Sequence, residues 1–191
     1  PNRYVWTDSV WQGAGVPAIS GFSERDGFYV TNFFYFQPAL NYGFAKPDPK
    51  KPWQLPVDHP DCLATREEMK KIMRYWLDAG ADGFRVDMAS SLVKGDKDFK
   101  ETMKLWADMR AMYDTEYPEA VLIAEWSDRA CAIAAGFHID FLIHFNDPAY
   151  TSLFRSETSR DLFRLFEDMP PSFFDKSGMG DIRAFLDSYL V

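Results

Sequence analysis

Residues 83–87 are Gly-Phe-Arg-Val-Asp, and residues 122–125 are Leu-Ile-Ala-Glu. Each stretch is a short apolar run that ends in a carboxylate, and each follows a segment with the apolar spacing of an amphipathic helix. Parallel strands that are buried on both faces have this pattern, because only their carboxyl-terminal tips meet solvent. The two stretches therefore predict strands of a parallel α/β fold, with Asp87 and Glu125 on the same rim.

Helices and strands are predicted to alternate on both sides of these stretches. Thr65 and Glu68 form a capping box, which predicts that a helix begins there and stops at Gly80. Its apolar residues recur on one face, at Met69, Ile72, Met73, Trp76 and Leu77. The later elements are a helix over 98–116, a strand over 120–125, a short helix over 128–135, a strand over 138–145, and helices over 150–168 and 179–190. This alternation is typical of a parallel α/β fold, and three strands are too few to close an eight-stranded barrel.

The first 60 residues or so have a different character, rich in glycine, proline, asparagine and aromatic residues. Residues 28–35 are rich in β-formers and predict one or two short strands. Residues 46–60 contain five prolines and predict an ordered loop. We therefore expect this part to lie outside the alternating strand–helix units.

Composition excludes several classes of function. The net charge is −8 and there is no basic run, which argues against a nucleic-acid partner. The two cysteines have no CxxC spacing, so neither a zinc site nor a disulfide framework is indicated. No segment has the roughly 18 apolar residues of a membrane span. Aromatic residues make up 17%, which suits either a cleft that stacks on sugar rings or a large aromatic core.

The two strand tips differ in their surroundings. Arg85 lies two residues before Asp87, on the same side of the strand, and a buried arginine would keep that carboxylate ionised, as a nucleophile requires. Glu125 lies between Ala124 and Trp126, where desolvation favours the neutral form that a general acid requires. The plainer alternatives are a helix cap for Asp87, a structural ion pair for Arg85, and a hydrogen bond to a neighbour for Glu125. Two facing carboxylates are what cleavage of a glycosidic bond needs.

Three motifs then resemble a known family. Residues 37–42 (Gln-Pro-Ala-Leu-Asn-Tyr), 76–87 (Trp-Leu-Asp-Ala-Gly-Ala-Asp-Gly-Phe-Arg-Val-Asp) and 123–126 (Ile-Ala-Glu-Trp) are similar, in order and spacing, to motifs of the alpha-amylase family, glycoside hydrolase family 13. The resemblance implies part of a (β/α)8 TIM barrel, about strands 4–6 with their helices. It also implies an irregular protruding domain, inserted after strand 3.

The resemblance also implies catalytic roles and a domain division. Asp87 would be the nucleophile, Glu125 the general acid/base and Arg85 the residue that holds the nucleophile, with retention of anomeric configuration. The protruding subdomain would be residues 1–42, and the partial barrel residues 43–191.

Two departures from the family pattern matter. Ser90 and Ser91 stand where the family often has Lys and His, which argues against the amylase-type calcium site and favours short oligosaccharides. The family's third-strand Asn-His and seventh-strand His-Asp motifs are not found, so we expect the 191 residues alone to be inactive. We expect no cofactor; calcium in a longer protein stays open, with no ligands identifiable here.

Candidate substrate-binding residues are Trp126, Phe34, Tyr35, His144 and Asn146, with Trp6 and Trp11 as further members of a sugar-stacking wall. For each of them a packing or hydrogen-bonding role is the alternative. The predicted function is a retaining glycoside hydrolase acting on α-glucosidic bonds of α-glucans or short oligosaccharides. The alternatives are a glucan-transferring or isomerising enzyme of the trehalose synthase type, and a non-catalytic carbohydrate-binding or transport-associated member of the family. The expected partner is an oligosaccharide or α-glucan substrate.

Overall fold

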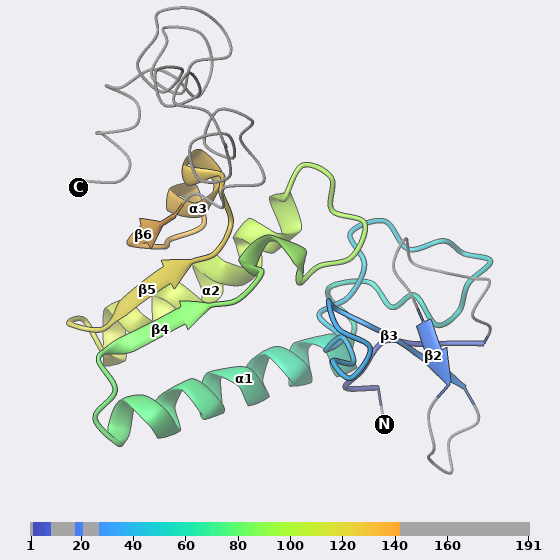
Figure 1. Ribbon diagram of the computed structural model, residues 1–191, viewed down its shortest axis with the longest axis horizontal. Helices are drawn as coiled ribbons and strands as arrows, with labels where there is room; N and C mark the ends of the chain where they lie inside the picture. The colour runs from blue at the N-terminus through green and yellow to red at the C-terminus, as the bar shows by residue number, and fades with distance from the viewer. Residues whose placement is uncertain (1, 9–17, 21–26, 142–191) are drawn as a thin grey trace, which may run out of the picture. The chain divides into compact units, whose positions relative to one another are not determined.

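A computed structural model describes residues 2–8, 18–20 and 27–141 (Figure 1). The chain divides into two compact units, one of residues 1–83 and 88–120 and the other of residues 84–87 and 121–191. Within the described residues, no helix combines the length and the apolar character needed to cross a bilayer. The division into residues 1–42 and 43–191 stays a prediction.

The first unit begins with a small antiparallel sheet. Its strands are β1 (Trp6–Thr7), β2 (Ala18–Ser20) and β3 (Phe28–Val30), in the order β1-β3-β2. The predicted β-rich stretch ends at Val30 because a turn follows: Gln37 accepts the Phe34 N–H through its side chain, and Asn32 N–H donates to the Gln37 carbonyl. A buried apolar cluster includes Val30 of β3 and is formed by Val5, Val30, Ala39 and Phe44, with Trp53 packed against it.

Helix α1 spans Pro60–Asp78 and starts more than a turn before the predicted capping box. His59 is the N-cap and accepts the Asp61 N–H, and Pro60 at the first position fixes φ where no donor is needed. Thr65 lies inside the helix, where its hydroxyl donates to the Asp61 carbonyl. The predicted start was therefore wrong, because the cap belongs to a histidine–proline pair that had been assigned to the loop.

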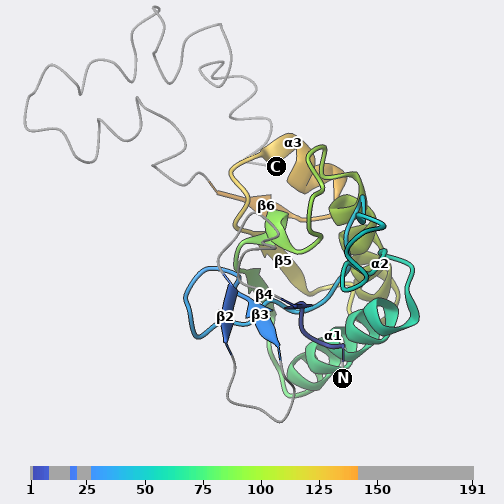
Figure 2. The same ribbon diagram turned by 90° about the vertical axis from the view of Figure 1, so that its right-hand side faces the viewer.

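Helix α2 spans Lys100–Glu116 and lies beside α1 (Figure 2). Two ion pairs join the helices, one near the middle of both and one towards the end of both, so the two run in the same direction. Lys70 lies 2.8 Å from Asp108, and Arg74 lies 2.6 Å from Glu116. This is the arrangement expected of successive helices in a parallel α/β fold.

The predicted apolar face of α1 is only partly buried among the described residues. Met73 and Leu77 are buried, whereas Ile72 and Trp76 are 45% and 53% exposed. In α2 the buried residues recur on one side of the helix and are Thr102, Leu105, Trp106, Met109, Met112 and Tyr113. The short 3-10 helix η1 (Ala89–Ser91) precedes α2, and its Ala89 carbonyl accepts the Trp106 indole N–H at 2.9 Å.

The second unit contains a three-stranded sheet in the order β4-β5-β6. All of β4 except its first residue, Gly83, belongs to this unit. The strands are β4 (Gly83–Val86), β5 (Val121–Ala124) and β6 (Ile139–Asp140), and the short helix α3 (Arg129–Ala134) connects β5 to β6. β5 and β6 are parallel, and β4 points the same way as β5 (Figure 1). The predicted strand over 138–145 is described only as far as residue 141.

Candidate active site

Carboxylates mark the ends of all three strands that the structure describes in the second unit. Asp87 directly follows β4, Glu125 directly follows β5, and Asp140 is the last residue of β6. The Glu125 N–H donates to the Val86 carbonyl at 3.0 Å, which sets the ends of β4 and β5 level. Carboxyl ends of parallel strands meet at one edge of a sheet, which is where such folds place their sites.

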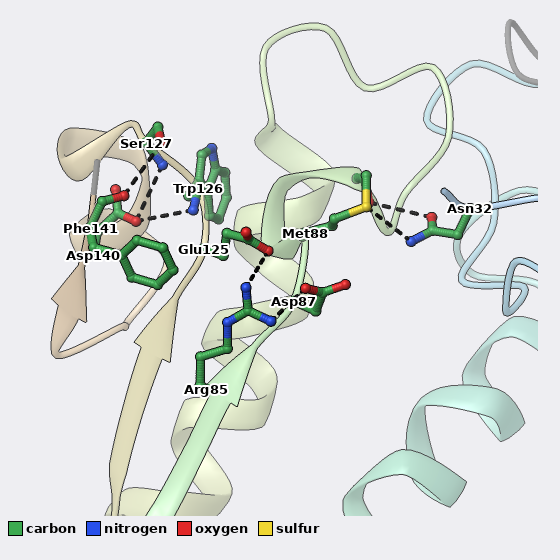
Figure 3. A network of polar contacts seen from close by, with 10 residues as sticks. Asn32, Arg85, Asp87, Met88, Glu125, Trp126, Ser127, Asp140 and Phe141 are labelled. Carbon is green, nitrogen blue, oxygen red and sulfur yellow. Dashed lines mark hydrogen bonds and ion pairs between the residues drawn. The ribbon is translucent and has the colours of Figure 1, made fainter. Parts of the chain in front are cut away.

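The guanidinium of Arg85 lies between the first two carboxylates (Figure 3). Its Nη1 lies 2.5 Å from Asp87 Oδ1, and its Nη2 lies 2.8 Å from Glu125 Oε2. Because one guanidinium makes both contacts, the two carboxylate oxygens lie within about 8 Å of each other. The structure therefore brings together the three residues that the sequence proposed as catalytic, and their roles stay proposals.

Burial at this edge differs from the expectation. The side chains of Arg85 and Asp87 are 47% and 58% exposed, whereas Glu125 is 18% exposed. The prediction of a buried arginine–carboxylate pair was wrong for the described residues, which leave both side chains about half exposed. The Phe141 ring does approach one side of the Arg85 guanidinium, with its centroid 5.8 Å away.

Trp126 is placed in the core of the second unit and not on its surface. It is 5% exposed, and its ring meets Phe137 edge-on at 6.3 Å between centroids. The ring therefore supports the end of β5 by packing. Contact between Trp126 and a sugar stays a prediction.

The other candidate sugar-binding aromatic residues belong to the first unit. Phe34 and Tyr35 are 50% and 69% exposed, and Phe34 stacks on Phe36 with an angle of 8° between the rings. Such exposed rings are available for stacking on a ligand. Trp6 lies in β1 and is half-buried. His144, Asn146 and Trp11 lie outside the described residues.

Asp140 is a residue to which the sequence assigned no role. It is 1% exposed, and its Oδ1 accepts the N–H groups of Trp126 at 3.0 Å and Ser127 at 3.3 Å. Burial raises the pKa of Asp140, and the backbone N–H groups oppose this shift. A signal was present in the sequence, since Asp140 follows an apolar position in a predicted strand as Asp87 does. It was overlooked because the predicted strand continued to residue 145.

No metal centre is found among the described residues, where no three His, Cys, Asp or Glu side chains are gathered so as to hold an ion. The groups that the structure describes around Arg85 are two carboxylates and one guanidinium. Such a set can supply an attacking oxygen, a transferable proton and a fixed positive charge.

The sequence of this chain is similar to those of known proteins. The trehalose synthase/amylase TreS of Mycolicibacterium smegmatis is 33% identical over 158 residues, which are 76% of this chain and 22% of that protein. The salivary alpha-glucosidase of Aedes aegypti is 38% identical over 73 residues, which are 38% of this chain and 10% of that protein. The chain thus spans about a fifth or less of the length of these relatives.

A solved structure agrees in fold. Eubacterium rectale Amy13B matches with a TM-score of 0.51 at 18% identity, over 75% of this chain and 24% of that one. Residues 18–146, more than half of the chain, match the family profile described as Alpha amylase, catalytic domain. The chain therefore belongs to the alpha-amylase family, and its parallel sheet is a portion of that family's TIM barrel.

Proposed function

We propose that this chain carries the nucleophile and the acid/base of a retaining enzyme that cleaves α-glucosidic bonds in α-glucans or short oligosaccharides. One observation carries the proposal: the Arg85 guanidinium contacts both Asp87 and Glu125 at the ends of adjacent strands. The upper limit of about 8 Å between their oxygens admits the roughly 5–5.5 Å of a retaining pair and also part of the roughly 6.5–9.5 Å range of an inverting pair, so retention is proposed from the resemblance to the alpha-amylase family. In this proposal, residues 1–42 form the domain that protrudes after the third barrel strand.

The first chemical step would use both carboxylates. Asp87 attacks the anomeric carbon while Glu125 donates its proton to the glycosidic oxygen. The bond between the anomeric carbon and the glycosidic oxygen breaks. The product is a glucosyl ester on Asp87. In the second step Glu125, now ionised, takes a proton from water, the oxygen of that water attacks the anomeric carbon, and Asp87 leaves as a carboxylate.

Arg85 suits this sequence of charges. In the proposed first step Asp87 attacks as a carboxylate and Glu125 gives up a proton, so in the ester intermediate the negative charge has moved to Glu125. A guanidinium within 2.8 Å of both groups stays paired with whichever carboxylate is charged. The arginine would therefore stabilise both stages without moving.

Transfer of the glucosyl group to another sugar is the second candidate. The name of the Mycolicibacterium relative, trehalose synthase/amylase, includes both kinds of activity. The two candidates share every catalytic residue proposed here and differ in what attacks the ester. Product analysis on maltose separates them: glucose alone indicates hydrolysis, whereas trehalose or longer sugars indicate transfer. A non-catalytic role is disfavoured, because the chain retains Asp87, Arg85 and Glu125.

Replacement of the proposed acid tests the function in the complete natural protein. Glu125→Gln is expected to lower turnover of maltose by roughly 10²–10⁴-fold, since general acid catalysis is worth about that much. It should impair a nitrophenyl α-glucoside less, because that leaving group needs little protonation. Glu119→Gln, on an exposed residue just before β5, is the matched control and should leave both rates unchanged. Equal losses on the two substrates would exclude Glu125 as the acid.

A further inference from the structure

The residue after Glu125 begins a bent segment of backbone. Ser127 has φ of 59°, in the left-handed region that residues other than glycine rarely adopt. Consecutive N–H groups, those of Trp126 and Ser127, converge there on one oxygen of Asp140, at 3.0 and 3.3 Å (Figure 3). Successive N–H groups that point to one place form a natural anion-binding turn. The Asp140 carboxylate is therefore what holds this bend.

Glu125 is consequently fixed on both of its sides. On its amino-terminal side, β5 ends at Ala124, and the Glu125 N–H donates to the Val86 carbonyl. On its carboxyl-terminal side, Asp140 accepts the next two N–H groups along the chain. The position of the Glu125 side chain relative to Arg85 and Asp87 then depends on both restraints.

Burial sets Asp140 apart from the other two carboxylates. It is 1% exposed, compared with 18% for Glu125 and 58% for Asp87. Burying a carboxylate is costly unless hydrogen bonds compensate, and the N–H groups of Trp126 and Ser127 supply such bonds to Asp140 Oδ1. The next residue, Phe141, places its ring 5.8 Å from the Arg85 guanidinium, so the end of β6 supports the site at two points.

Building on the proposed function, we propose that Asp140 is a positioning residue, which holds the backbone after Glu125 so that the acid/base carboxyl meets the glycosidic oxygen. Asp140 does not contact substrate in this proposal. Its effect is exerted through the two N–H groups and reaches the reaction only through Glu125.

Substitution of Asp140 should then give the same kinetic signature as damage to the acid. A displacement of about 1 Å at a catalytic group can cost on the order of 10²-fold in rate. Asp140→Ala in the complete natural protein should lower kcat on maltose by roughly 10²-fold, with KM nearly unchanged. The loss on a nitrophenyl α-glucoside should be clearly smaller. Asp140→Asn should restore most of the rate, because its amide oxygen still accepts both N–H groups.

His138 offers a matched control. Its Nδ1 accepts the Leu122 N–H at 3.0 Å, which is the same kind of bond to the same strand, made near the start of β5 and away from Glu125. His138→Ala should lower thermal stability, with any loss of rate equal on the two substrates. A purely structural Asp140 would behave like this control.

A double-mutant comparison gives the second measurement. If Asp140 acts through Glu125, then Asp140→Ala should change the rate less than about threefold in a Glu125→Gln background. If Asp140→Ala does not fold, Asp140→Glu replaces it, since it keeps the charge and moves the acceptor by one methylene. The same dependence on the leaving group is then expected.

The outcomes separate this inference from the proposed function. A wild-type protein that processes no α-glucoside, or a Glu125→Gln variant with full activity, overturns the proposed function and this inference with it. A Glu125→Gln variant that behaves as an acid mutant, beside Asp140 variants with equal losses on both substrates and additive effects, overturns the role of Asp140 alone.

Discussion

Two arginines, one in each unit of the molecule, use the same planar fork in different ways. In the first unit, Arg74 gives Nε and Nη2 to the two oxygens of one carboxylate, Glu116, both at 2.6 Å. In the second unit, Arg85 divides its fork between Asp87 and Glu125. The first pair is electrically balanced and joins two helices. The second group has one cation and two carboxylates, so it can accept a proton or an ester bond and remain paired.

The two modes of pairing predict that Arg85, and not Arg74, affects catalysis. A saturated bidentate pair fixes geometry and has no spare acceptor. A shared guanidinium faces two carboxyl groups, only one of which is charged at each stage of the proposed reaction, so the negative charge can move from Asp87 to Glu125 beside it. The comparison therefore predicts changes in activity from substitutions around Arg85, and only changes in stability from substitutions around Arg74.

The largest expected effect comes from removal of the nucleophile. Asp87→Asn in the complete natural protein should lower kcat/KM on maltose by about 10⁴-fold or more, because no glucosyl ester can form. Asp82→Asn, on an exposed residue just before β4, is the control and should leave the rate unchanged. A residual rate within tenfold of the wild type would remove Asp87 from the mechanism.

Replacement of the shared arginine should have the next largest effect. Arg85→Lys keeps the charge but supplies one compact ammonium, which cannot present the flat fork that pairs with two carboxylates. We expect turnover of maltose to fall by roughly 10²-fold. The same substitution at Arg74 should leave turnover within twofold. Equal effects of the two substitutions would contradict the distinction between the arginines.

The strand tips could be predicted from sequence because the cause is local. A short apolar run that ends in a carboxylate follows from burial on both faces, and this holds for Asp87 and for Glu125 alike. The start of α1 could not be placed in this way, because the capping pattern at Thr65 occurs inside the helix. There the threonine hydroxyl bonds to the Asp61 carbonyl, while the actual cap is His59.

The role of Asp140 and the exposure of Arg85 depend on contacts that are distant in sequence. The proposed positioning role of Asp140 rests on hydrogen bonds from the N–H groups of Trp126 and Ser127. No spacing rule in the sequence connects these residues. Arg85 was expected to be buried because its strand looked internal, whereas its side chain is 47% exposed. Local pattern thus predicted where the carboxylates are, but not what surrounds them.

Lys94, in the first unit, has no carboxylate partner among the residues that the structure describes. Lys94 is buried, and its Nζ donates to two neutral oxygens, Asn32 Oδ1 at 3.2 Å and the Ser91 carbonyl at 2.8 Å. Burial lowers the pKa of Lys94 from 10.5 to about 8. The folded state therefore binds fewer protons than the unfolded state between these values, and stability rises with pH through this window.

The Lys94→Met variant should lack this rise. Between pH 7 and pH 10 the free energy of unfolding of the wild type should rise by about 2–3 kcal/mol relative to that of the variant. Denaturant unfolding, followed by tryptophan fluorescence at several pH values, measures the difference. Lys97→Met, on an exposed residue of the same loop, is the control. A difference between wild type and Lys94→Met that does not change with pH would show that the amine is not desolvated.

The smallest effect is expected at the balanced pair. Hydrogen bonding to Arg74 lowers the pKa of Glu116, so the pair stabilises the folded state above the ordinary pKa of a glutamate, and this contribution is lost as pH falls through the lowered value. Both side chains are more than a third exposed, so solvent and salt screen the attraction. Arg74→Met should therefore lower the thermal midpoint by no more than about 2–3 °C at neutral pH and low salt, with turnover unchanged. Calorimetry should show that the decrease shrinks in 1 M salt and in acid. A decrease that survives both conditions would mean that Arg74 acts through the packing of its methylene stem and not through its charge.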